Sequence, residues 1–140
     1  MNDRFFLDTN IFAYAFDTKA HTKARRAAQL IRRAAETGTG VVSYQVVQEF
    51  FNLAFRRFSQ PMSVADAEQY LITVFRPLLA IHSSAALYVD ALRIAGKYRL
   101  AWYDCLIVAA ALQSQCGVLY SEDLQHGQKI DGLLIENPFI

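Results

Sequence analysis

Four acidic residues of this sequence have types and positions that suit chemistry: Asp8, Glu49, Asp104 and Asp123. Each comes where a short apolar strand is expected to end, or on the helix that follows it. The carboxyl ends of parallel strands lie at one edge of a sheet, so we expect the four carboxylates to meet there. Carboxylates that gather without basic partners repel one another unless a cation lies between them. Ligands that offer only oxygen favour Mg²⁺ or Mn²⁺, and such ions activate water against phosphate esters.

Each acid also has an ordinary structural interpretation when it is taken alone. Asp8 could cap a helix that begins near Asn10, and Asp104 could complement the N-terminal dipole of its helix. Glu49 belongs to a polar helix stripe that could face solvent, and Asp123 could be a turn residue. The shared edge favours the metal site, as does the lack of a lysine or arginine beside any of the four in the expected loops.

Other catalytic patterns are missing from the sequence. The three histidines, His21, His82 and His126, have no spacing typical of metal ligands, and no CxxC pair is present, which disfavours zinc. No glycine-rich phosphate loop occurs, which disfavours nucleotide-triphosphate chemistry. No GxSxG elbow for a nucleophilic serine occurs either.

The elements that must position the acids alternate between strand and helix. Continuous apolar runs, typical of strands buried on both faces, predict strands over residues 4–7, 41–43, 78–81, 118–120 and 133–135. Helices are predicted over residues 10–16, 22–36, 44–58, 63–76, 84–98 and 102–115. This alternation predicts an α/β fold, a three-layer α/β/α sandwich with a central, mostly parallel sheet of four to five strands. With no linker or repeat, we expect a single domain over residues 1–140.

Composition limits the class of protein further. The chain has 140 residues, of which 54% are hydrophobic and 19% charged, and its formal net charge is +1. This apolar balance, with many large apolar residues on helices 44–58 and 63–76, suggests that a partner or a second copy covers part of the surface. No apolar run reaches the length of a membrane span, and the N-terminus has an acid where a signal peptide needs a basic region. We therefore expect a cytoplasmic protein.

Four segments stand out when they are taken together. They are LDTNI at 7–11, the apolar helix around Glu49, YDCLIVAAA at 103–111 and SEDL at 121–124. In this order and spacing they resemble PIN-domain ribonucleases, and the chain's ending is similar to that of many VapC-type toxins of toxin–antitoxin pairs. The resemblance covers the whole chain. It implies Mg²⁺- or Mn²⁺-dependent endonucleolytic cleavage of RNA that leaves a 5′-phosphate and a 3′-hydroxyl.

The resemblance also implies roles for individual residues. Asp8, Glu49, Asp104 and Asp123 match the family's catalytic acids, and three neighbours match its supporting polar positions: Thr9, Asn10 and Ser121. We expect Asp8 and Asp104 to bind the main metal ion, Asp123 to complete the site or help to hold a second ion, and Glu49 to act through a water molecule or as its general base. Glu122, next to Asp123, could share that role. The resemblance further implies a homodimer and a cognate antitoxin whose C-terminal segment occupies the groove.

Basic and aromatic residues could hold the RNA. Residues 18–35 contain six lysines and arginines and no acid. Within this segment Lys23, Arg25 and Arg26 are the candidate RNA contacts, and Trp102, with Tyr103 beside it, could stack an unpaired base. The alternatives are a solvated helix face and ordinary core aromatics.

Two other classes of protein remain as alternatives. A phosphate-accepting receiver domain needs an aspartate after the middle strand and a lysine after a late strand. This chain instead has His82 after strand 78–81, and Ser121 and Glu122 after strand 118–120. A non-catalytic module would keep the fold and use the groove only for a protein partner, and the intact set of four acids argues against it.

Overall fold

The computed structural model describes residues 2–140, and its centre is a six-stranded sheet. The strands are β1 (Phe5–Leu7), β2 (Gly40–Ser43), β3 (Leu79–Ile81), β4 (Val118–Tyr120), β5 (Lys129–Ile130) and β6 (Leu133–Glu136). Their order in the sheet is β3-β2-β1-β4-β6-β5, and every neighbouring pair is parallel except β5 with β6. This confirms the predicted mostly parallel sheet.

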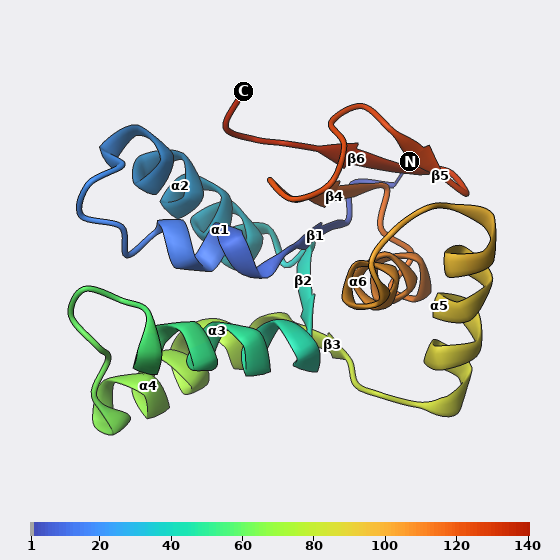
Figure 1. Ribbon diagram of the computed structural model, residues 1–140. Coiled ribbons are helices and arrows are strands. Elements are labelled where there is room, and N and C mark those ends of the chain that lie inside the picture. The colour runs from blue at the N-terminus through green and yellow to red at the C-terminus, as the bar shows by residue number, and fades with distance from the viewer. Residues whose placement is uncertain (1) are drawn as a thin grey trace.

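Helices cover both faces of the sheet (Figure 1). They are α1 (Thr9–Tyr14), α2 (His21–Thr37), α3 (Tyr44–Arg56), α4 (Val64–Tyr70), α5 (Ala85–Lys97) and α6 (Trp102–Gln113). Helices α1 to α4 lie on one side of β1 and β2, and α5 and α6 lie on the other. The predicted α/β/α sandwich is therefore confirmed. None of the helices within residues 2–140 is long and apolar enough to cross a membrane.

Strand β1 occupies the middle of the sheet and places the first acid. Phe6 and Leu7 are completely buried, as expected for a strand covered on both faces. Leu7 pairs with Tyr120 of β4 in a parallel register. The residues that follow these two strands, Asp8 and Ser121, therefore leave the sheet side by side.

The sheet has one strand more than the sequence analysis expected. Strand β5 pairs antiparallel with β6 through a two-residue turn of Asp131 and Gly132, whose φ angles are 49° and 87°. Asp-Gly between two short strands is a strong signal for such a hairpin, because both turn residues must adopt positive φ. The Asp-Gly turn was visible in the sequence. The strand before it has only two residues, which is too short to be recognised from an apolar pattern.

The helix expected over residues 63–76 is interrupted. Ser63 caps α4 by accepting a hydrogen bond from the amide of Asp66. The chain then widens into a π-helical turn over Leu71–Phe75 and a 3₁₀ turn over Arg76–Leu78. Two local features account for this. The hydroxyl of Thr73 donates to the carbonyl of Gln69 and competes with the helical amide, and Pro77 has no amide to donate.

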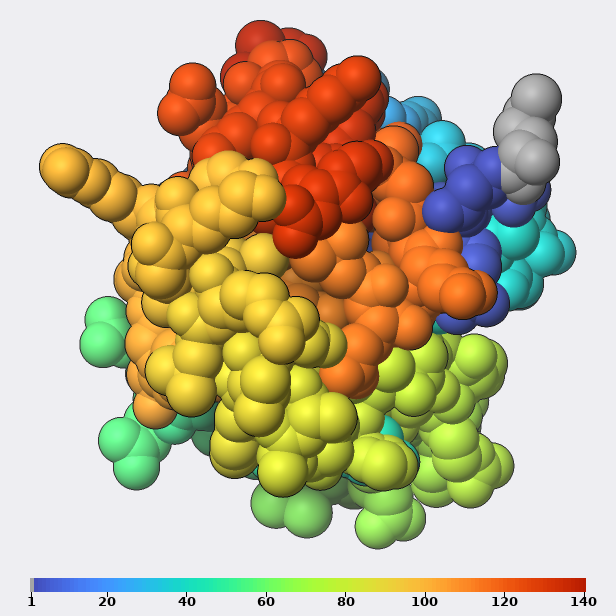
Figure 2. Space-filling model, turned by 90° about the vertical axis from the view of Figure 1, so that its right-hand side faces the viewer, coloured from blue at the N-terminus to red at the C-terminus, as the bar shows by residue number. Residues whose placement is uncertain are grey.

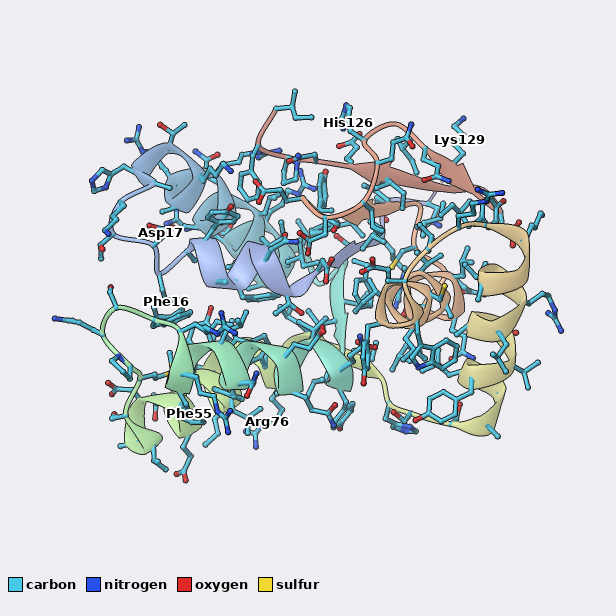
Figure 3. The ribbon with its side chains drawn as sticks, in the orientation of Figure 1. Phe16, Asp17, Phe55, Arg76, His126 and Lys129 are labelled. Carbon is cyan, nitrogen blue, oxygen red and sulfur yellow. The ribbon has the colours of Figure 1, made fainter. Side chains whose placement is uncertain are left out.

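Aromatic residues of α3, of α4 and of the segments that follow them pack against one another. Phe50 is completely buried and contacts the rings of Phe58, Tyr70 and Phe75 at centroid distances of 5.2–5.8 Å. Among the apolar residues that we expected to face a partner, Phe55 remains 42% exposed, and Figure 3 shows it on the outer side of α3. Mutual packing thus buries part of the apolar surplus of this region, while Tyr44, Val64 and Ile72 remain exposed as well.

A further group of exposed apolar side chains lies on α5. Tyr88, Val89 and Leu92 are 44%, 51% and 60% exposed, and Figure 2 shows α5 lying across the face turned towards the viewer.

Gly40 lets α2 approach β2 closely. A Cβ atom at this position would lie 2.1 Å from Cβ and 2.7 Å from Cα of Ala34. We expect Gly40→Ala to destabilise the fold by about 1–3 kcal/mol because α2 must move away. Gly96 in α5 is the matched control, since a Cβ there meets nothing within 4 Å. Gly96→Ala should stabilise by roughly 0.5–1 kcal/mol through helix propensity. Urea unfolding measures both changes, and equal effects would contradict the close packing.

Candidate active site

Asp8 is fixed at the point where β1 ends and α1 begins. It is the N-cap of α1, and its Oδ1 accepts a hydrogen bond from the amide of Thr9 at 2.7 Å. Its Oδ2 accepts from the hydroxyl of Ser121 at 2.7 Å, and the residue is only 5% exposed. The helix-cap interpretation is thus correct for Asp8. It is compatible with the site, because the capping carboxylate lines the same cavity as the other acids.

Glu49 turns towards Asp8 from α3. The hydroxyl of Thr9 donates to Oε1 of Glu49 at 2.9 Å, so Thr9 connects the two acids through its amide and its side chain. Glu49 is half-buried, and Asn52, one turn further along the same polar stripe, lines the same cavity. The stripe therefore faces a cavity at this point instead of open solvent.

Asp123 is held by the two remaining supporting residues. Nδ2 of Asn10 donates to Oδ2 of Asp123 at 3.1 Å, and the amide of Asp123 donates to the Ser121 hydroxyl at 3.1 Å. Ser121 is completely buried and also donates to Asp8. One serine thus holds both acids in place.

All four acids line one cavity of about 900 Å³, and three of them, Asp8, Glu49 and Asp104, have a raised pKa. Burial raises the pKa of Asp8 to about 7, and the charges of Asp123 and Glu49 add to this. Burial also raises the pKa of Glu49, with repulsion from Asp104 and Asp123. Asp104, in the first turn of α6, has its pKa raised by burial and then by Asp123. The end of the cavity at the sheet edge is therefore short of positive charge.

This set of donors fits a hydrated hard cation. Within residues 2–140, no three His, Cys, Asp or Glu side chains lie close enough together to enclose an ion by themselves. Mg²⁺ sheds its water reluctantly and is usually held by one or two carboxylates and several waters, for which the cavity has room. The residues at this end offer carboxylate, hydroxyl and amide oxygens, the ligands that Mg²⁺ and Mn²⁺ prefer.

Glu122 is distinguished from Asp123 by its partners. The Tyr14 hydroxyl donates to its Oε1 at 2.6 Å, and the ammonium of Lys23 forms an ion pair with its Oε2. Burial opposes ionisation here, but the hydrogen bonds from Lys23 and Tyr14 outweigh it and lower the pKa of Glu122. Glu122 therefore has a positive partner already, and Asp123 is the better candidate ligand.

The candidate RNA contacts lie outside the lining of the cavity. Lys23 pairs with Glu122, and Nε of Arg26 donates to the carbonyl of Pro138 at 3.3 Å. Arg25 is exposed on α2, and Trp102 is 39% exposed beside Tyr88, with ring centroids 6.3 Å apart.

Residues close to these four line the cavity instead. They are Lys19 of the same basic segment, Arg57, and Tyr103, which was expected to stack beside Trp102. The sequence signal for the first two was their position in the turns just after α1 and α3, the two helices that carry Thr9 and Glu49.

Comparisons with known proteins place this arrangement in a known context. The family model described as PIN domain matches residues 5–130. A comparison with curated proteins gave no match.

Several solved structures share the fold. A toxin–antitoxin complex from Klebsiella pneumoniae is 18% identical, with a TM-score of 0.66 over 95% of this chain and 96% of that one. A sarcin–ricin loop cleaving VapC toxin of Mycobacterium tuberculosis is 18% identical, with a TM-score of 0.62 over 85% and 89%. A DNA-bound VapBC complex from Salmonella typhimurium is 21% identical, with a TM-score of 0.61 over 95% and 96%.

Proposed function

The chain belongs to the PIN domain family, and from that premise we propose that it is a divalent-metal-dependent endoribonuclease and the toxin of a toxin–antitoxin pair. One observation carries the proposal: Asp8, Glu49, Asp104 and Asp123 line a single cavity at the edge of the sheet. Metal-dependent phosphodiester hydrolysis needs a site that holds cations beside the phosphate and a base beside the attacking water, and this set of acids offers both.

The similar structures support the substrate and the partner. One of them is a toxin that cleaves the sarcin–ricin loop, which supports RNA as the substrate here. Others are toxin–antitoxin complexes, which supports a cognate antitoxin as the partner. The exposed apolar side chains of α5 support a further protein contact, for which we propose a homodimer.

In this proposal Asp8 and Asp104 would hold the metal ion together with water molecules, and Asp123 would complete the site through such a water. A bound Mg²⁺ or Mn²⁺ would neutralise charge on the phosphate and increase the acidity of water. Ser121 and the amide of Thr9 keep Asp8 fixed, so that little reorganisation is needed when the substrate binds.

Glu49 is the proposed general base. The Thr9 hydroxyl orients Glu49 through Oε1, and Oε2 is the atom that accepts the proton of the attacking water. Because burial raises the pKa of Glu49, its carboxylate is a stronger base than an exposed glutamate.

The two neighbouring acids at 122 and 123 allow a matched test of the site. We expect Asp123→Asn to slow cleavage of single-stranded RNA in Mg²⁺ by roughly 10–100-fold, as is typical when a group that holds or orients a metal is lost. Glu122→Gln should change the rate by less than about threefold, because Glu122 pairs with Lys23 and Tyr14 instead of the ion. Single-turnover rates measure both, with EDTA as the metal-free blank. A larger loss from Glu122→Gln would reverse the assignment of the fourth acid.

A further inference from the structure

The cavity of the candidate active site has two chemically different ends. The four acids occupy the end at the sheet edge, and the segments that follow α1 and α3 line the other end, around residues 16–19 and 57–60. Figure 1 shows these two segments on the side of the molecule away from β1 and β2. Figure 3 places Phe16 and Asp17 there, where the chain leaves α1. Two positive residues line this second end, Lys19 and Arg57.

The two ends are separated by a length of helix on both walls of the cavity. Helix α1 separates them on one side of the cavity, and its six residues span about 9 Å at 1.5 Å per residue. On the other side, Glu49 and Arg57 are eight positions apart along α3 and its cap, which corresponds to about 12 Å. A phosphate at the acidic end therefore leaves Lys19 and Arg57 for a different group of the same ligand.

The charges of Lys19 and Arg57 are available to a ligand. Both residues are exposed, and within residues 2–140 neither the Lys19 ammonium nor the Arg57 guanidinium makes a hydrogen bond or ion pair with a side chain. Asp17, the nearest acid in the turn, uses Oδ1 to accept from the amides of Lys19 and Ala20, at 2.8 and 3.0 Å. Lys23 and Arg26, by contrast, already have partners.

We propose that Lys19 and Arg57 form a second phosphate subsite, which binds a backbone phosphate of single-stranded RNA some way along the strand from the scissile one. The inference rests on the proposed function, because RNA is the ligand that would present phosphates to both ends. Each residue comes from a different wall, so a strand lying in the cavity contacts the α1–α2 segment and the α3–α4 segment at once. The subsite sets a minimum length for a good substrate.

The test compares two pairs of charge removals that differ only in place. Lys19→Ala/Arg57→Ala removes the subsite, and Arg56→Ala/Lys129→Ala removes the same charge elsewhere. Arg56 is exposed, adjoins Arg57 and lies outside the cavity lining, and Figure 3 places Lys129 near β5, far from Phe16 and Asp17. Binding to a fluorescent oligouridylate is measured by anisotropy in EDTA over a range of salt concentrations, with thermal melts to show that both proteins fold.

The expected result is a change in salt dependence for the subsite pair. For single strands, each lost phosphate contact makes the slope of log K against log salt shallower by about 0.7, and because the two residues bind one phosphate the slope should change by about that amount. The control pair should leave most of the slope unchanged. In Mg²⁺, the subsite pair should slow cleavage of the oligouridylate but not of the dinucleotide UpU, whose single phosphate occupies the acidic end.

Three results would contradict the proposed phosphate subsite. One is equal slopes for the two pairs. Another is equal slowing of UpU and of the longer strand. A third is a Lys19→Ala/Arg57→Ala protein that binds RNA as the wild type does but no longer binds an acidic peptide that the wild type binds. This result would assign this end of the cavity to a protein partner. If the wild type binds RNA through Lys19 and Arg57 and yet cleaves nothing in Mg²⁺, the proposed function fails while the subsite stands.

Discussion

Replacing Asp8 by asparagine should slow RNA cleavage in Mg²⁺ by roughly 100-fold or more, a loss of the size seen when a group that stabilises charge in a transition state is removed. The substitution should leave the local geometry intact. Oδ1 of the asparagine can still accept from the amide of Thr9, and its amide can donate to the oxygen of Ser121, which already accepts from Asp123. The substitution therefore removes only one negative charge from the acidic end of the cavity.

The same substitution should make the metal-free protein more stable. The pKa of Asp8 is raised from 3.8 to about 7 in the folded protein, mainly by burial. A carboxyl with a raised folded pKa binds its proton more tightly when folded. It therefore does not destabilise the fold below about pH 4, and its destabilising effect grows between about pH 4 and pH 7 and is complete above that range. At about 1.4 kcal/mol per pKa unit, the variant should gain on the order of 2–4 kcal/mol over the wild type at pH 8.

Urea unfolding in EDTA at pH 4 and pH 8 measures this difference. We expect the gain from Asp8→Asn to be present at pH 8 and small at pH 4. A variant that is less stable than the wild type at pH 8 would mean that the Asp8 carboxylate stabilises the folded state. Asp8 would then not be an uncompensated buried charge in the metal-free protein. A variant that gains stability and still cleaves at the wild-type rate would remove Asp8 from the catalytic site.

Mg²⁺ should raise the melting temperature of the wild type by roughly 5–10 °C at saturating concentration. An ion that binds only the folded state contributes about 2.7 kcal/mol at 100 times its dissociation constant, and for a domain of this size each kcal/mol raises the melting temperature by a few degrees. The physical reason is the repulsion between Asp8, Glu49, Asp104 and Asp123, which a divalent cation relieves. Because the ion competes with the proton of Asp8, the rise should be larger at pH 8 than at pH 6.

Variants identify the residues responsible for that rise. Asp8→Asn and Asp104→Asn should each lose most of it, whereas Glu122→Gln should keep it, because Glu122 pairs with Lys23. Differential scanning calorimetry with and without Mg²⁺ gives the shifts. An equal rise in all four proteins would mean that the ion binds elsewhere, and no rise in the wild type would contradict a resident divalent metal.

The parts of the fold that sequence reasoning predicted are those encoded locally. Continuous apolar runs predicted β1 and β4, and because both are parallel strands in the sheet, the positions of Asp8 and Ser121 at one edge followed. The elements that interrupt the regular alternation of strands and helices were not predicted. Strand β5 has two residues, too few for a periodic signal, although Asp131 and Gly132 encode its turn. The π-helical turn before Pro77 depends on a side-chain hydrogen bond of Thr73, which no apolar period reveals.

The details of the candidate site depend on contacts between distant parts of the chain. The sequence did not separate Glu122 from Asp123, because the difference comes from Lys23, which is 99 positions away along the chain. The direction of the polar stripe that carries Glu49 was likewise undetermined until the Thr9 hydroxyl was placed against it. Lys23 and Arg26 were expected at the RNA because their charge is visible in the sequence, but their partners on the C-terminal part of the chain are not.

The most direct measurement of the central claim is the chemistry of the ends that the purified protein leaves on a single-stranded RNA. The proposed function predicts products with a 5′-phosphate and a 3′-hydroxyl, formed in Mg²⁺ or Mn²⁺, absent in EDTA and reduced roughly 100-fold or more by Asp8→Asn. Products that carry a 3′-phosphate or a cyclic phosphate, or cleavage that persists in EDTA and in the Asp8→Asn protein, would contradict it.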